Sequence, residues 1–227
     1  MAGPARSTLP NMPTLLTEAT TFSTLSFEQK LDRLAEVAVR TGLGLKAGQE
    51  LVITAPTDAL PLVRLITTHA YKAGAKLVTT LFADDELVLA RYKYASDESF
   101  DYAPQWMHEG IATAFRSGAA RMAISGTDPR LLSGQDPSRV SRANIASSKA
   151  NKPAMELITR HEINWTIVAC ATPAWAALVF PNDPPALAQG KLWDAIFKVS
   201  RITSDDPVAE WQQHGACLLY TSPSPRD

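Results

Sequence analysis

Residues 50–82, ELVITAPTDALPLVRLITTHAYKAGAKLVTTLF, place two β-branched runs on either side of a helical pattern. Residues 50–54 predict a buried strand that ends at Pro56, and residues 76–82 predict a second strand. Between them, apolar side chains recur at helical spacing as far as Gly74. A strand, a helix and a strand in this order indicate a unit with parallel strands, since the helix carries the chain back across the sheet.

Capping signals predict where the first helices begin and end. Ser26 and Gln29 have the spacing of a capping box, so a helix begins there and is expected to end near Gly42. Thr57 or Asp58 is expected to cap the helix that follows the first strand.

The rest of the chain shows further strand, helix and turn patterns. Residues 120–125 and 164–170 predict a third and a fourth strand, and residues 106–116 predict a helix. Proline has a preset φ and aspartate accepts hydrogen bonds from free amides, so most Asp-Pro pairs predict helix starts and the rest turns. The pairs are 128–129, 136–137, 183–184 and 206–207. Pro153 is expected to kink or split the helix after the second pair.

The order of these elements predicts an α/β fold, with a mostly parallel sheet flanked by helices on both faces. The 227 residues are 45% hydrophobic and 20% charged, as in an ordinary globular domain. A formal net charge of −1 argues against binding nucleic acid or an anionic membrane through the whole surface. Two cysteines and no long apolar run favour a cytoplasmic protein.

Three segments differ in composition. Residues 1–24 are expected to form a loose leader, with Met1 or Met12 as the true start, and residues 25–216 are expected to form the domain. Residues 217–227, CLLYTSPSPRD, can be written as bases that look like a sequencing-library adapter. We therefore expect a non-native tail, with a natural Pro/Ser-rich tail as the alternative.

The chemically active side chains form no recognisable catalytic motif. A helical zinc site needs two histidines four residues apart, but the positions four after His108 and His161 hold Ala112 and Trp165. His69 is expected to be a hydrogen-bonded histidine at the edge of the core. Cys170 is expected to be a small buried hydrophobe, while a hydrolase that uses Cys170 or Ser125 is a weaker alternative.

Two further patterns have ordinary structural explanations. The glycines at 42, 44 and 48 precede a strand, the reverse of a dinucleotide-binding loop, and so indicate a turn. Five basic residues without aromatic partners indicate a solvated helix face: Arg139, Arg142, Lys149, Lys152 and Arg160.

Polar residues follow each predicted strand, and such loops gather at the edge of a parallel sheet where ligands usually bind. We expect a candidate site there, although turn and cap roles explain the same residues. The loops are Thr54-Ala55-Pro56, Asp84-Asp85, Ser125-Gly126-Thr127-Asp128 and Ala171-Thr172-Pro173.

Six segments, in order between Phe27 and His214, resemble the thermophilic metalloaminopeptidase family, also called the aminopeptidase T family or M29. They are LKAGQELVI from Leu45, HAYKAGAKLV from His69, SGTDPRLLSGQDPSRV from Ser125, WTIVACATPAWAALVFP from Trp165, LWDAIFKVSRI from Leu192 and DDPVAEW from Asp205. The resemblance covers the amino-terminal domain only, so the fold is expected to be incomplete relative to a full family chain.

The resemblance implies a cytoplasmic homodimer that removes N-terminal residues from peptides. It also implies two divalent metal ions per subunit, Zn, Co or Mg, which lower the pKa of a bridging water and polarise the scissile carbonyl. The family's metal ligands lie in its carboxyl-terminal part, so no catalytic, cofactor-binding or metal residue carries over to this chain. We expect residues 1–227 to bind no metal and to be inactive, with surfaces around Trp175, Trp193 or Trp211 left exposed. The alternative is a free-standing α/β ligand-binding or interaction module without catalysis.

Overall fold

A computed structural model describes residues 25–221, with side chains described as far as residue 217. The described residues contain four parallel strands in the order β2-β1-β3-β4. The strands are β1 (Glu50–Pro56), β2 (Leu77–Ala83), β3 (Ala120–Ser125) and β4 (Trp165–Ala169). The predicted α/β fold is confirmed, with each strand within two residues of its expected position.

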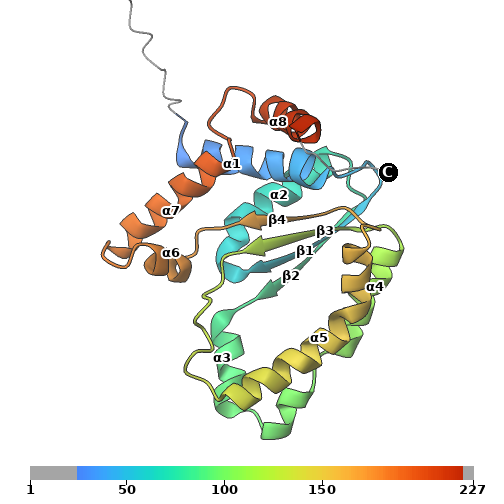
Figure 1. Cartoon of the computed structure of the whole chain (residues 1–227), viewed down its shortest axis with the longest axis vertical. Coiled ribbons are helices and arrows are strands. Elements are labelled where there is room, and N and C mark those ends of the chain that lie inside the picture. Colours follow the sequence, from blue (N-terminus) through green and yellow to red (C-terminus); the bar gives the residue numbers. More distant parts are fainter. Residues whose placement is uncertain (1–24, 222–227) are drawn as a thin grey trace, which may run out of the picture.

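Helices cover both faces of the sheet, with α1 and α2 on one face and α4 and α5 on the other (Figure 1). The helices are α1 (Phe27–Val37), α2 (Leu60–Lys72), α3 (Asp85–Tyr94), α4 (Gln105–Arg116), α5 (Pro137–Thr159), α6 (Pro173–Val179), α7 (Pro185–Val199) and α8 (Pro207–Thr221). Three further segments are helical but not α-helical. They are the π-helix η1 (Ala38–Leu43) and the 3₁₀ helices η2 (Thr57–Ala59) and η3 (Asp97–Asp101).

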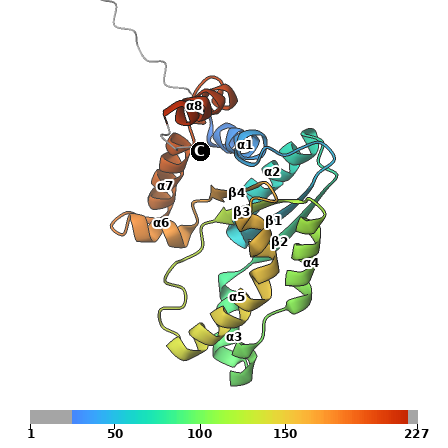
Figure 2. The ribbon, with the colours of Figure 1, turned by 45° about the vertical axis from the view of Figure 1, so that its right-hand side comes forward.

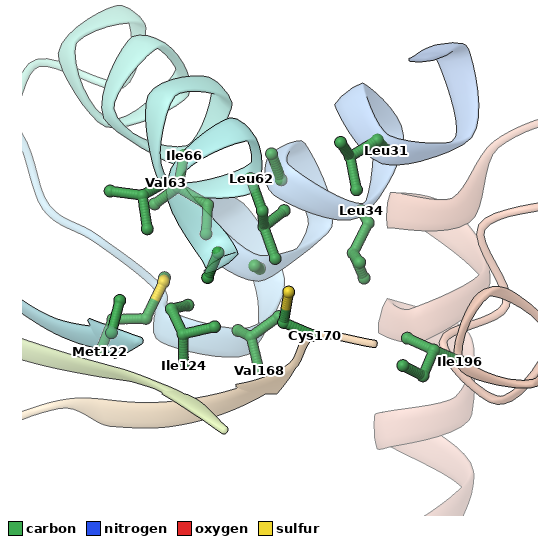
Figure 3. Close-up of a cluster of buried hydrophobic side chains, with 14 of the residues drawn as sticks. Leu31, Leu34, Leu62, Val63, Ile66, Met122, Ile124, Val168, Cys170 and Ile196 are labelled. Carbon is green, nitrogen blue, oxygen red and sulfur yellow. The ribbon is translucent and has the colours of Figure 1, made fainter. Parts of the chain in front are cut away.

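The main hydrophobic core lies between the sheet and the first two helices. Figure 3 shows side chains of α2 above Met122, Ile124 and Val168 of the sheet, and Leu34 of α1 on the side of Ile196 of α7. Alternate strand residues supply this core because successive side chains of a strand point to opposite faces. Leu51 and Ile53 of β1 are fully buried on this side, whereas Val52 packs on the opposite side with α4 and α5.

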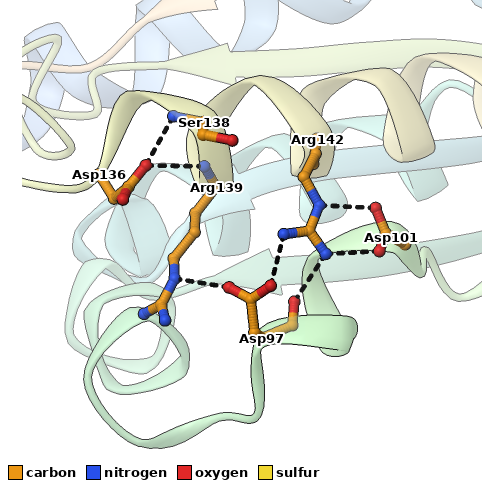
Figure 4. A network of polar contacts seen from close by, with 6 residues as sticks. All are labelled: Asp97, Asp101, Asp136, Ser138, Arg139 and Arg142. Atoms are coloured by element: carbon orange, nitrogen blue, oxygen red, sulfur yellow. Dashed lines mark hydrogen bonds and ion pairs between the residues drawn. The ribbon is translucent and has the colours of Figure 1, made fainter.

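A separate small cluster joins α3 and η3 to α5. Phe100 is fully buried there, with its ring centroid 4.9 Å from that of Tyr92. Beside it, Arg142 forms ion pairs with Asp97 at 2.7 Å and Asp101 at 2.5 Å (Figure 4). Arg142 holds the pKa of both carboxyls below their usual range through these hydrogen bonds. Two of the five basic residues expected on a solvated face, Arg139 and Arg142, therefore tie this cluster to α5.

One of the predicted helix boundaries is wrong and another is confirmed. The first helical stretch ends near Gly42 as expected, since α1 runs into η1, which ends at Leu43, and Gly44 with a φ of 61° follows as a left-handed cap. Neither Thr57 nor Asp58 caps α2, since η2 precedes that helix and the Thr57 hydroxyl donates to Asp84 Oδ2 at 3.0 Å. The capping box of Ser26 and Gln29 is confirmed.

Pro153 is expected to kink or split its helix, and the split is wrong. Helix α5 is not split, since it runs as one helix from Pro137 to Thr159 with Pro153 inside it. Ala150 and Ala154, on either side of this proline, are buried, so packing stabilises the helix where one backbone hydrogen bond is lost. Among the Asp-Pro pairs, 136–137 and 206–207 begin helices directly, 183–184 lies just before α7, and 128–129 lies in a turn region.

Helix α8 packs against α1 and η1, α7 contacts α1 through Trp193 and Phe197 against Phe27, and α6 packs against α7 (Figure 2). Trp193 of α7 is buried, and Trp175 and Trp211 are half-buried against the main core. The expectation that these three tryptophans mark exposed surface is therefore wrong. The exposed tryptophans among residues 25–217 are Trp106 and Trp165 instead.

The expected leader, residues 1–24, lies outside the described residues, as do residues 222–227 of the expected tail. None of the helices within residues 25–221 is both long enough and apolar enough to cross a membrane.

Candidate functional site

The carboxyl ends of the strands meet at one edge of the sheet, where the topology changes direction between β1 and β3. The chain leaves β1 through α2 on one face and leaves β3 through α5 on the other. In parallel sheets, the crevice at such a point is where ligands bind. The structure thus places the four predicted loops at a common edge, as their parallel strands require.

Hydrogen bonds join these loops in two pairs. The Thr57 hydroxyl, just after β1, donates to Asp84 after β2 at 3.0 Å. On the other side, the Thr172 hydroxyl donates to the Gly126 carbonyl oxygen. The amide of Cys170 donates to the Ser125 carbonyl oxygen at 2.8 Å, which extends the β3–β4 ladder into the loops.

Three of the seven polar side chains in these loops, those of Asp84, Asp128 and Thr172, have a structural partner. Asp84 caps α3 by accepting from the Leu87 amide at 3.0 Å, and this bond with that of Thr57 lowers the pKa of its carboxyl. Asp128 accepts from the Arg130 amide at 2.8 Å, which forms a turn. Thr172 caps α6 through the Trp175 amide at 3.3 Å. The cap and turn interpretation therefore accounts for these three residues of the predicted site.

A cavity of about 380 Å³ opens beside these loops, between the sheet and helices α4 and α5. We call it the interlayer cavity. Its wall includes Val52, Thr54, Pro56, Leu81, Ala83, Met107, His108, Ile111, Phe115, Arg121, Ile124, Thr127, Asn151, Met155 and Ile158. A concave, mostly apolar cavity with a few polar groups is the usual form of a small-molecule site.

Two polar residues of this cavity were not singled out as site residues from the sequence. Arg121 interrupts the apolar run of β3 and lies half-buried in the wall. The Nδ1 atom of His108 is buried and has no hydrogen-bond partner among the described residues. A charged residue within a strand whose two faces are both covered is the signal that could have indicated Arg121.

The four histidines have separate surroundings. His69 Nε2 lies 2.8 Å from Asp32 Oδ1, so the expected hydrogen-bonded histidine at the core edge is confirmed. His161 occupies a turn with a φ of 56°, and His214 stacks edge-on against Trp211. No three His, Cys, Asp or Glu side chains within residues 25–217 are placed to hold a metal ion together.

Cys170 is a buried residue in unfavourable surroundings for nucleophilic chemistry. Burial, with a smaller contribution from the charge of Asp58, raises the pKa of its thiol to about 12. A second cavity of about 380 Å³ lies beside it, and no histidine is among the residues that line this cavity. The hydrogen bonds of the described residues likewise give Ser125 no histidine partner. These surroundings disfavour a hydrolase that uses either residue.

We expect Cys170 to resist alkylation in the folded protein. At pH 8, a thiol with this pKa is roughly one part in ten thousand thiolate, and the thiolate is the reactive form. Iodoacetamide should label the exposed Cys217 first and Cys170 only after unfolding in guanidinium, as read by mass spectrometry of the peptides. Labelling of both cysteines at similar rates in the native protein would contradict the burial and restore the hydrolase hypothesis.

Comparisons with known proteins identify close relatives. The family described as thermophilic metalloprotease (M29) matches residues 27–222. Aminopeptidase T of Thermus thermophilus is 47% identical over 193 residues, which cover 85% of this chain and 47% of the relative. Aminopeptidase AmpS of Bacillus subtilis is 38% identical over 189 residues, which cover 83% of this chain and 46% of the relative.

A solved structure agrees with the sequence relatives. Wild-type AmpT from Thermus thermophilus aligns with a TM-score of 0.79 and 46% identity, covering 85% of this chain and 47% of that chain. The chain therefore spans about half the length of the relatives that it matches.

Proposed function

The chain belongs to the thermophilic metalloprotease family M29, and from this premise we propose that it is the amino-terminal half of a metal-dependent aminopeptidase. The intact protein would remove N-terminal residues from peptides. The observation that supports the proposal is the 47% identity to aminopeptidase T, which extends over 85% of this chain.

The described residues do not fit the metal centre that the family name implies. Their His, Cys, Asp and Glu side chains form no cluster of three or more suited to a metal ion. We therefore assign no catalytic step to residues 25–217, and we propose that two divalent ions, Zn, Co or Mg, are held by residues outside this part. It follows that residues 1–227 alone would be inactive.

The test compares the 227-residue chain with a chimera in which residues 1–216 continue into the remaining half of the Thermus thermophilus relative. We expect no cleavage of leucine p-nitroanilide and no stoichiometric metal with the 227-residue chain. The chimera should cleave the substrate and lose activity on addition of a chelator.

The remaining half of the relative, produced alone, is the control for activity that needs nothing from this chain. Chelator-sensitive turnover by the 227-residue chain would contradict the proposal that the metal ions are held by residues outside this part of the protein. A folded chimera without activity would contradict the proposal that this chain forms half of the enzyme.

We further propose that the intact protein is a cytoplasmic homodimer, as the family resemblance suggests. The domain limits of residues 25–216 are part of the same proposal. Sedimentation of the chimera would test the dimer, since a monomer at micromolar concentration would exclude it.

A further inference from the structure

The interlayer cavity is lined by a cationic side chain, that of Arg121, which has no counter-ion among residues 25–217. Arg121 pairs in register with Val52 of β1 and Trp165 of β4. Val52 packs on the side of α4 and α5, and residues paired in a parallel sheet point to the same face, so Arg121 also faces these helices. None of the hydrogen bonds or ion pairs formed by residues 25–217 involves its guanidinium.

An unpaired charge at this place is unfavourable for folding. Burial lowers the pKa of Arg121, because the cavity wall solvates the charged form less well than water does. Val52, its partner in β1 on the same face, is only 6% exposed, so an apolar residue would suit the position of Arg121. A residue that lowers the stability of the fold around it is typical of a functional position.

The rest of the wall defines the chemistry of a ligand. No acidic residue is among those that line the cavity, and Ile111, Phe115 and Ile158 give it an apolar body. His108 also lines the cavity, but its Nδ1 atom is fully buried and out of reach of a ligand, so Arg121 is the polar group on which the inference rests. The volume of about 380 Å³ is within the range of small-molecule sites.

We propose that the interlayer cavity binds a small monocarboxylate with an apolar body, whose carboxylate pairs with Arg121 and whose body packs against α4 and α5. Arginine matches a carboxylate because its planar guanidinium donates two parallel hydrogen bonds. A phosphate dianion would keep a net negative charge beside the single arginine of the wall, and the ammonium of a free amino acid would find no acidic residue there. A neutral apolar molecule would leave the charge of Arg121 uncompensated.

This inference goes beyond peptide hydrolysis and does not depend on it. Binding is measured on the 227-residue chain without any metal or peptide, so its failure and the failure of the proposed function are distinguishable.

The experiment measures binding of octanoate, octanol and octylamine by titration calorimetry. Arg121→Met removes the charge but keeps an unbranched side chain, and Arg116→Met, at the exposed end of α4, is the matched control. We expect octanoate to bind the wild type more tightly than either analogue. The affinity for octanoate should fall at least 10-fold in Arg121→Met and stay unchanged in Arg116→Met, while Arg121→Met keeps its affinity for octanol.

Thermal unfolding gives an independent measurement. Without ligand, Arg121→Met should raise Tm by about 2–4 °C, since it removes an uncompensated charge. Octanoate should raise the Tm of the wild type and not that of Arg121→Met. The proposal is overturned if the wild type does not bind millimolar octanoate, if octanol binds as tightly as octanoate, or if both proteins bind octanoate equally. A lower Tm or failed folding of ligand-free Arg121→Met would also overturn it, because Arg121 would then stabilise the fold.

Discussion

Gly126→Ala should destabilise the protein by about 2–4 kcal/mol, which for a chain of this size lowers Tm by about 5–15 °C. A Cβ atom at Gly126 would overlap the carbonyl oxygen of Cys170 and lie 2.9 Å from Cγ2 of Thr172. The loop after β3 cannot move away at little cost, because the Thr172 hydroxyl donates to the carbonyl of Gly126 itself. The added methyl group therefore separates the ends of β3 and β4 or strains both loops.

Gly110→Ala is the matched control, since a Cβ at that position in α4 meets no described atom within 4 Å beyond its chain neighbours and the backbone of its own helix. Alanine is the better helix former, so this variant should be more stable than the wild type by up to about 1 kcal/mol. Urea unfolding of both variants, followed by circular dichroism, gives the two changes in free energy with opposite expected signs. An unfolding midpoint of Gly126→Ala equal to that of the wild type would contradict the close approach of the two loops.

The role of Gly126 illustrates what could and could not be predicted from the sequence. The pattern around residues 120–125 correctly predicts β3, because β-strand periodicity is a local property. It also places residues 126–128 at the carboxyl edge of the sheet. The reason for a glycine there is the backbone of Cys170, 44 positions later, and no local pattern contains that contact.

The helices show the same division between local and tertiary causes. Ser26 and Asp136 cap their helices as predicted, since a cap depends on residues two or three positions away. The uninterrupted course of α5 past Pro153 could not be predicted, because it depends on buried contacts of Ala150 and Ala154. The interlayer cavity was missed for a similar reason, since its wall combines two helices and neighbouring strands.

Phe100→Ala should cost about 3–5 kcal/mol and loosen one part of the molecule selectively. Phe100 is 0% exposed and forms the centre of the small cluster that joins α3, η3 and α5. The guanidinium groups of Arg91 and Arg139 lie 5.4 and 5.3 Å from its ring centroid, so the truncation also removes two cation–π contacts. The main core shares no residue with this cluster and keeps its own contacts.

Hydrogen exchange measured by mass spectrometry distinguishes local from global loss of stability. In Phe100→Ala, amides of α3, η3 and the first turns of α5 should exchange much faster, while those of β1 and β3 change less. Tyr102→Ala is the control, because this nearby aromatic side chain is 71% exposed and its removal should change stability by less than about 0.5 kcal/mol. Equal acceleration across the sheet and the α3–η3 segment would mean that the two clusters unfold as one unit. The local stability assigned to Phe100 would then be wrong, and the ion pairs of Arg142 with Asp97 and Asp101 would belong to the global unfolding transition as well.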